Sequence, residues 1–241
     1  MELIVAKDYE GMSKIAGEIL IKEIRANPEL VLGLATGSTP VGMYKEIIKE
    51  HKKNGLDFSR VKSFNLDEYV GLSGDNHQSY KYFMKENFFK HINIKEENTF
   101  IPNGKAKDLE KHCREYDRMI YEAGGIDIQI LGVGENGHIA FNEPEHYLFT
   151  GTSVINLTKE TVKVNSRFFA EGERVPETAI TMGMGGILKA KKIVLLANGK
   201  RKNHVIKRLI DENKVSTLFP VSFLLLHPDV TIIIDEEALN G

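Results

Sequence analysis

The sequence has almost no cysteine and no pronounced excess of either charge. Cys113 is the single cysteine among 241 residues, which excludes an intrachain disulfide and any CxxC metal or redox motif. The 32 basic and 34 acidic residues give a net charge of −2, which argues against nucleic acid or a membrane surface as the main partner. No apolar run approaches the roughly 20 residues that a membrane span needs.

Two further signals are missing. The first residues, MELIVAKDYEGMSK, contain no cationic segment followed by an apolar one, so no secretion signal is predicted. We therefore expect a soluble, cytoplasmic chain. The eight histidines show neither HxH nor HExxH spacing, so we expect no metal site built from protein ligands.

Length and organisation favour one domain. A chain of this size buries about 70% of its unfolded surface, enough for one large α/β core or two modest domains. Because no repeat, low-complexity segment or Pro/Ser-rich linker divides it, we predict a single domain over residues 1–241.

Short β-branched runs alternate with helical stretches. The runs are apolar throughout, which is typical of parallel strands covered on both faces, so we predict an α/β fold with a mostly parallel sheet. The predicted strands are Glu2–Ala6, 30–35, 61–66, 126–133, 154–157, Lys192–Ala197 and 230–234, and the predicted helices follow Asp8, follow residue 40 and span 80–89, 108–121 and 200–211. Residues 141–174 are polar and weakly periodic, which fits either a mobile lid or a long surface excursion.

Ligands of open α/β sheets bind beyond the carboxyl ends of the strands, and three polar, glycine-containing segments follow predicted strands. The first, residues 36–40 (TGSTP), joins a strand to a helix. Gly37 permits a positive φ, and Ser38 and Thr39 supply hydroxyls beside free helix amides, which suits a phosphate. An ordinary Ser/Thr helix cap explains the segment equally well. No Gly-Lys-Ser/Thr follows, so this is not a Walker loop.

The second segment, residues 132–144 (GVGENGHIAFNEP), matches GxGxxG after a strand. Pro144 lies where a dinucleotide-binding helix would continue, and this argues against NAD. The turn instead gathers Asn136, His138 and Glu143 near one strand end. A histidine and a carboxylate so placed suit proton transfer, and a polar turn without function is the alternative.

The third segment, residues 64–69 (FNLDEY), reads as a strand that ends in two acids, of which side-chain alternation lets only one face the strand-end site. A partly desolvated carboxylate there is a candidate base, whereas a helix cap or a solvated acidic edge is the alternative. Arg167 and Lys202 are candidate anion-binding residues or simple surface charges. Cys113 shares a helical face with apolar residues and is predicted to lie in the core.

Taken together, these segments resemble one family. LATGSTPVGMY, FNLDEYVGL, GVGENGHIAFNEP, NSRFF and LHPDVTIIIDEEAL, in this order and spacing, closely resemble the glucosamine-6-phosphate deaminases over essentially the whole chain. The resemblance implies a Rossmann-like fold shared with ribose-5-phosphate isomerase and 6-phosphogluconolactonase. It also implies the cofactor-free conversion of glucosamine 6-phosphate and water to fructose 6-phosphate and ammonia.

The resemblance also implies roles for residues. Asp67 would move the proton between C2 and C1, and His138 would open the sugar ring, oriented by Glu143 and by position 136. Well-known members carry Asp at that position, whereas this chain has Asn136, as the shorter bacterial members do. Glu143 must then supply the negative charge beside the histidine.

The phosphate would be held by the loop after the second predicted strand and by two cations, namely Gly37, Ser38, Thr39, Arg167 and Lys202. Lys192 stands where allosteric members carry an acid, so we expect hyperbolic kinetics. We expect a sugar phosphate as the partner, with no nucleic acid, membrane, cofactor or metal, and leave monomer and homo-oligomer open.

Two rival functions fit parts of the pattern. A 6-phosphogluconolactonase would share the fold and a Gly-His turn, but it would require neither Asp67 nor the Phe-Asn-Glu-Pro continuation. A sugar-phosphate sensor of a transcriptional regulator would normally carry a DNA-binding helix-turn-helix, for which no residues are left over. Neither rival releases ammonia from glucosamine 6-phosphate.

Overall fold

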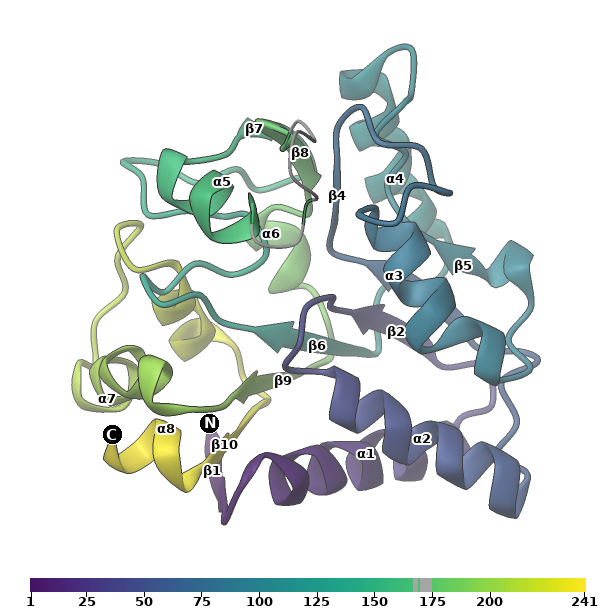
Figure 1. Cartoon of the computed structure of the whole chain (residues 1–241), viewed down its shortest axis with the longest axis horizontal. Coiled ribbons are helices and arrows are strands. Elements are labelled where there is room, and N and C mark those ends of the chain that lie inside the picture. Colours follow the sequence, from purple (N-terminus) through teal and green to yellow (C-terminus); the bar gives the residue numbers. More distant parts are fainter. Residues whose placement is uncertain (167–168, 170–174) are drawn as a thin grey trace.

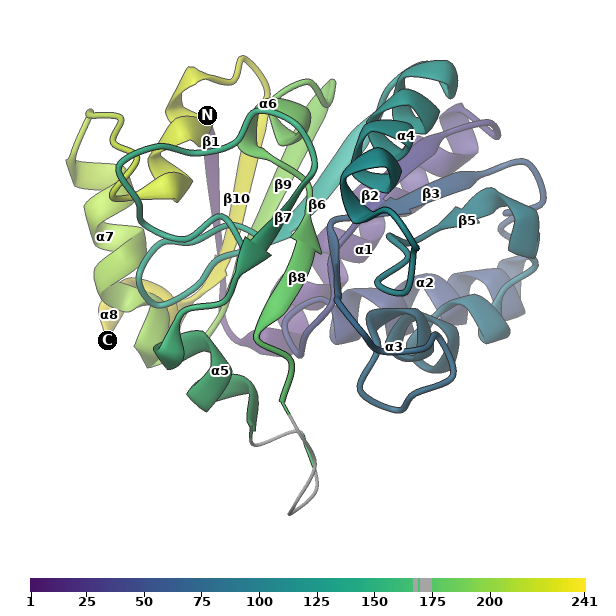
Figure 2. The same cartoon turned by 90° about the horizontal axis from the view of Figure 1, so that it is seen from above.

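The computed structural model describes residues 1–166, 169 and 175–241. Within them, seven strands form one sheet in which every neighbouring pair is parallel. Figure 2 shows these strands side by side across the sheet, in the order β1 (Glu2–Ala6), β10 (Val230–Asp235), β9 (Lys192–Ala197), β6 (Ile128–Gly132), β2 (Val31–Leu34), β3 (Lys62–Asn65) and β5 (Thr99–Phe100). The predicted mostly parallel α/β sheet is therefore confirmed.

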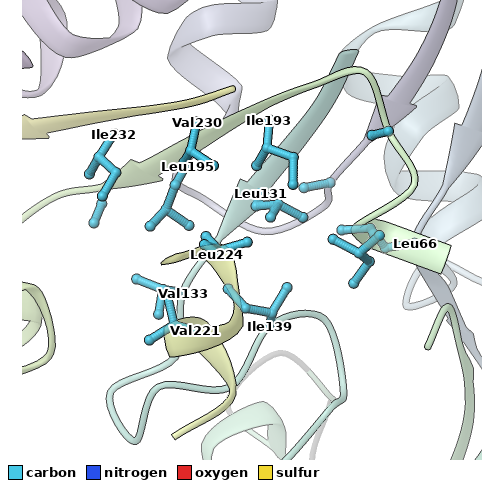
Figure 3. Close-up of a cluster of buried hydrophobic side chains, with 14 of the residues drawn as sticks. Leu66, Leu131, Val133, Ile139, Ile193, Leu195, Val221, Leu224, Val230 and Ile232 are labelled. Carbon is cyan, nitrogen blue, oxygen red and sulfur yellow. The ribbon is translucent and has the colours of Figure 1, made fainter. Parts of the chain in front are cut away.

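Alternate strand residues enter separate apolar cores on the two faces of this sheet. One face, with Ile128 and Ile130, packs against α1 (Tyr9–Ala26), α2 (Val41–Asn54) and α3 (Tyr80–Asn87). The other face packs against α4, α6, α7, α8 and the 3-10 helix η4, and Figure 3 shows Leu131, Ile193 and Leu195 of the sheet facing Leu224 of η4. Burying both faces explains why the strands contain so few polar residues. The bounds on this second face are α4 Leu109–Glu122, α6 Met184–Ile187, α7 Asn203–Asp211, α8 Glu236–Asn240 and η4 Pro220–Leu226.

Two expected strands need correction, and a further strand was not expected. Residues 64–69 do not form one strand, because β3 ends at Asn65 and β4 (Asp67–Tyr69) begins a second sheet. This second sheet is antiparallel, with the order β4, β8 (Thr178–Thr181) and β7 (Ser153–Asn156). The strand predicted at 154–157 is β7, so it pairs here and not in the parallel sheet. The sequence did not predict β8, since four residues carry too little periodicity to show it.

The parallel sheet has a point at which its strand order reverses. From β2 the chain continues to β3 and β5 on one side, and from β6 it continues to β9 and β10 on the other (Figure 2). Ligands of open α/β sheets bind at such a reversal, beyond the carboxyl ends of the strands. The loops after β2 and β6 are the first two predicted site segments.

The segment predicted as a lid or a surface excursion contains β7 and the helix α5 (Lys159–Ser166), which Figure 1 shows beside the second sheet. Residues 167–168 and 170–174 at its end lie outside the described residues, and so does the predicted phosphate-binding Arg167. None of the helices that the structure describes combines the length and hydrophobicity of a membrane span.

Candidate active site

Asp67 is the first residue of β4 and is 6% exposed. Burial, together with the neighbouring charge of Glu68, raises the pKa of the Asp67 carboxyl group to about 8. No hydrogen bond to its side chain is found among the described residues, so nothing offsets the lost hydration of its charge. A carboxylate with a pKa this close to neutrality suits general base catalysis.

Glu68 has a different environment from Asp67, as side-chain alternation along a strand requires. Its carboxylate accepts hydrogen bonds from the backbone N–H groups of Tyr69, Tyr80 and Lys81 at 2.8, 2.9 and 3.0 Å. It therefore satisfies the free amides at the start of α3. The helix-cap alternative considered for these acids applies to Glu68 and leaves Asp67 without such a role.

The GxGxxG turn after β6 is shaped around His138. A Cβ atom on Gly134 would lie 2.2–2.5 Å from three atoms of the His138 imidazole, and a Cβ on Gly137 would lie 2.4 Å from the Phe219 ring. Gly137 also has a φ of 88°, which favours glycine. The base of the turn is anchored in the core, where Val133 and Ile139 lie beside Val221 (Figure 3). Gly134 therefore leaves room for the His138 imidazole, and Gly137 leaves room for the Phe219 ring.

Asn136, His138 and Glu143 lie in one hydrogen-bonded cluster. The Asn136 side-chain oxygen is 2.8 Å from His138 Nδ1 and accepts the His138 backbone N–H at 3.1 Å. The Asn136 amide nitrogen donates to Glu143 Oε2 at 2.7 Å, and Glu143 Oε2 is 3.4 Å from His138 Nδ1. Since an amide oxygen only accepts, Nδ1 of the imidazole carries the hydrogen and Nε2 keeps its lone pair when His138 is neutral.

Glu143 is 6% exposed, and burial by itself would raise the pKa of its carboxyl group. The hydrogen bond and charge of His138, with hydrogen bonds from Thr161 and Asn136, outweigh burial and lower this pKa. Glu143 is thus kept as a carboxylate beside His138. Thr161 of α5, which donates to Glu143 Oε1 at 2.5 Å, was not singled out from the sequence, where nothing marks it among the polar residues around it.

Strand β8 connects Asp67 with this cluster. Thr181 lies opposite Asp67 in the antiparallel pair of β4 and β8, and its side-chain oxygen accepts the backbone N–H of Phe141 at 3.2 Å. Asn142 donates to the Met182 carbonyl at 2.9 Å. Asp67 and the turn that carries His138 are far apart in sequence, but both are bound by β8 and the residue that follows it.

The loop after β2 does not use its hydroxyls to cap α2. Pro40 occupies the N-cap position with no side-chain cap, so the Ser/Thr-cap alternative is wrong. Gly37 has a φ of 90°, Tyr9 donates its hydroxyl to the Ser38 carbonyl at 3.0 Å, and Thr39 donates to the Asn198 side-chain oxygen at 3.0 Å. This geometry is compatible with the predicted phosphate loop.

Asn198 directly follows β9, and the sequence reading missed it, although its place after a predicted strand is a usable signal. Lys202 ends the 3-10 helix η3 (Lys200–Lys202) four residues later and is half-buried. The contact between Thr39 and Asn198 thus joins the loop after β2 to the loop that leads to Lys202.

A metal site and a reactive cysteine are the remaining candidate chemistries. The described residues contain no cluster of three His, Cys, Asp or Glu side chains arranged to hold a metal ion. Cys113 is 3% exposed, and burial, with Asp117 nearby, raises the pKa of its thiol to about 11, so its predicted place in the core is confirmed.

The structure defines an α/β protein whose carboxyl groups and histidine lie in segments that follow strands of a parallel sheet. The chain belongs to the family described as glucosamine-6-phosphate isomerases/6-phosphogluconolactonase, whose sequence profile matches residues 10–233. It is 58% identical over 240 residues to a glucosamine-6-phosphate deaminase of Thermoanaerobacter pseudethanolicus (strain ATCC 33223 / 39E), covering 100% of this chain and 94% of the relative. A glucosamine-6-phosphate deaminase of Clostridium perfringens (strain SM101 / Type A) is 54% identical over 238 residues, covering 99% and 98%.

Solved structures agree with this assignment. A structure of a monomeric glucosamine-6-phosphate deaminase superposes with a TM-score of 0.95 at 44% identity, covering 99% of this chain and 98% of that one. A 6-phosphogluconolactonase of Trypanosoma cruzi superposes with a TM-score of 0.77 at 21% identity over 100% and 96% of the two chains, which shows a shared fold. The resemblance stated from the motifs is confirmed.

Proposed function

We propose that this protein converts glucosamine 6-phosphate and water to fructose 6-phosphate and ammonia. The observation that carries the proposal is a buried Asp67 with a pKa raised to about 8, connected through β8 to the Asn136–His138–Glu143 cluster. This set supplies the two acid–base functions that the reaction needs, one beside the ring oxygen and one beside C2. The identities of 50–58% to curated deaminases support it.

Ring opening is assigned to His138. Because Nδ1 carries the hydrogen, Nε2 takes the proton of the C1 hydroxyl group and returns a proton to the ring oxygen as the C1–O bond to the ring breaks. The imidazolium that forms in between is stabilised by Glu143, whose carboxylate lies 3.4 Å from Nδ1. Asn136 orients both groups and carries no charge itself.

Isomerisation is assigned to Asp67. Its carboxylate removes the proton at C2 of the open-chain amino aldehyde while the C1 carbonyl oxygen takes a proton from the C2 ammonium group, giving an enolamine. The protonated Asp67 then delivers its proton to C1, which leaves a protonated imine at C2. Water then adds at C2 of the resulting imine, and ammonia leaves to give the ketone of fructose 6-phosphate. No electrons are exchanged with an external acceptor in any of these steps, so no cofactor is assigned.

The substrate phosphate is assigned to the loop of Gly37, Ser38 and Thr39 and to two cations, Lys202 and Arg167. Helix amides after residue 40 and the Ser38 hydroxyl supply donors to an anion, while the Thr39 hydroxyl donates to Asn198. The contact of Thr39 with Asn198 supports this, since it brings the loop and the segment that leads to Lys202 together.

Replacing Lys202 by alanine is expected to raise KM for glucosamine 6-phosphate by roughly ten- to hundredfold, because charge-assisted bonds to the phosphate are lost. The rate with unphosphorylated glucosamine is expected to be equally low in variant and parent. Lys200→Ala, at an exposed neighbour in η3, is the control. A Lys202 variant that still prefers the phosphorylated substrate as strongly as the parent does would contradict this role.

We further propose that residues 1–241 form one domain, with a lid within 141–174, that acts in the cytoplasm on a free sugar phosphate. Nucleic acid, membrane and metal have no part in this proposal. The near-neutral charge and the continuous parallel sheet support it.

Ammonia release is the deciding experiment. The purified chain is incubated with glucosamine 6-phosphate, and ammonia and fructose 6-phosphate are measured together, with hydrolysis of 6-phosphogluconolactone measured in parallel. We expect equal amounts of the two products and no lactone hydrolysis above the spontaneous rate. Lactone hydrolysis without ammonia would establish the rival lactonase, and binding without either reaction would establish a sensor.

A further inference from the structure

The buried carboxylate of Glu143 has a third partner besides Asn136 and His138. Oε2 faces Asn136 and His138, whereas Oε1 accepts a hydrogen bond of 2.5 Å from the Thr161 hydroxyl. Thr161 is 8% exposed and lies in α5, on a segment separate from the turn that carries the other partners. The carboxylate is thereby held at both of its oxygens, from two different parts of the chain.

The direction of these hydrogen bonds follows from the groups involved. A carboxylate only accepts, so the single hydrogen of the Thr161 hydroxyl points to Glu143. The Thr161 oxygen then accepts from the Thr158 hydroxyl at 3.0 Å, and the Thr158 oxygen accepts the Thr161 backbone N–H at 3.1 Å. Thr158 therefore both caps the first turn of α5 and orients the Thr161 hydroxyl.

Helix α5 is itself fixed to the site. Leu157, just before the helix, and Val162, next to Thr161, pack in the apolar cluster that contains Tyr69 of β4 and Phe141 of the histidine turn. The helix thus packs in a cluster with residues that lie two positions from Asp67 and from Glu143 in the sequence. The Thr161 hydroxyl therefore reaches Glu143 from a defined position.

We propose that Thr161 is a positioning residue for the ring-opening reaction, holding Glu143 Oε1 so that Oε2 faces Asn136 and His138. This inference rests on the function proposed above. Thr161 acts through Glu143, so its removal affects the ionisation and orientation of that carboxylate while the Asp67 step is left intact.

The expected effect on pH dependence has a defined sign. Hydrogen bonds to a carboxylate favour its charged form, so the loss of the Thr161 hydroxyl raises the pKa of Glu143. Among the described residues, His138 is the titratable group whose charge acts on Glu143, and it is unchanged by the substitution. In kcat/KM, the acidic limb that reports Glu143 is then expected to move to higher pH, whereas the limb at higher pH that reports Asp67 stays in place.

The experiment compares Thr161→Val, which removes the hydroxyl and keeps the shape, with Thr161→Ser, which keeps the hydroxyl. Thr231→Val is the control for a buried threonine. Thr231 lies near the amino end of β10, whereas the site lies beyond the carboxyl ends of the strands. We expect Thr161→Val to shift the lower limb upward by about one pH unit, with kcat/KM about tenfold lower there. Thr161→Ser and Thr231→Val are expected to keep the parent profile.

Folding is checked by thermal unfolding of each variant. Should Thr161→Val fail to fold, Thr161→Ala carries the same expectation. The proposal is overturned if a folded variant without the hydroxyl has its lower acidic limb at the same pH as the parent. It is also overturned if Thr161→Ser and Thr161→Val lose the same amount of kcat/KM. A parent that releases no ammonia would instead contradict the proposed function.

Discussion

Replacing Asp67 by asparagine is expected to lower kcat by roughly 10²–10⁴-fold while binding of a substrate analogue is retained, because removal of a general base commonly has this effect. Asparagine has nearly the same shape, but its amide does not accept the C2 proton. The measurement is ammonia release together with exchange of the C2 proton into deuterated water. Near-parent turnover in a folded Asp67→Asn protein would refute the assigned role.

The same substitution is expected to stabilise the protein at alkaline pH. The Asp67 carboxyl has a pKa of about 8 in the folded protein and about 4 in the unfolded chain. Between these values the folded state holds a proton that the unfolded state has released, so the free energy of unfolding falls as pH rises. Asparagine does not titrate. The gain in the free energy of unfolding of Asp67→Asn over the parent is therefore absent near pH 4 and complete above about pH 8.

Thermal unfolding against pH measures this effect. We expect Asp67→Asn to raise Tm by at least a few degrees near pH 9 and to match the parent near pH 4. Asp57→Asn is the control, since hydrogen bonds from Ser59 and Asn93 lower the pKa of Asp57, so the loss of this carboxylate is not expected to raise Tm at alkaline pH. A Tm difference for Asp67→Asn that does not depend on pH would show that the carboxyl is not held at a raised pKa.

Replacing Gly134 by alanine is expected to lower kcat by about 10²-fold, since displacement of a catalytic group by about 1 Å has effects of this size. The added Cβ would lie 2.2–2.5 Å from the imidazole of His138, so the ring must leave its place between Asn136 and the sugar. The backbone of Gly134 has no positive φ, so the change acts on the ring and not on the fold of the turn.

Gly11→Ala is the control for this prediction. Gly11 lies in the first turn of α1, and a Cβ there would make only ordinary contacts at 3.4 Å. We expect parent activity and equal or higher stability from it, because alanine favours a helix. If Gly134→Ala retained parent kcat with an unchanged Tm, His138 would not need its observed position, and the assignment of ring opening to it would be wrong.

Local patterns were sufficient for much of the fold. Glu2–Ala6 and Lys192–Ala197 are strands at the predicted bounds, and Asp8 caps α1 through its bond to the Gly11 N–H. A continuous β-branched run or a capping side chain depends on neighbours in sequence, so such elements are visible without a structure. The glycine turn with His138 and Glu143 was visible for the same reason, because its members lie within one short segment.

Other features depend on contacts between distant residues, and only the tertiary structure shows them. The pairing of Asp67 with Thr181 places the acid next to the histidine turn, yet β8 leaves no clear trace in the sequence. Contacts with α3 distinguish Glu68 from Asp67, because the free amides of α3 donate to Glu68 and leave Asp67 as the proposed base. The bond from Thr161 to Glu143 likewise exists because α5 packs beside the turn. The sequence by itself determined the parallel sheet and the chemical groups at its edge, since these follow from local pattern, while burial and pairing across the chain decided which groups are charged and what holds them.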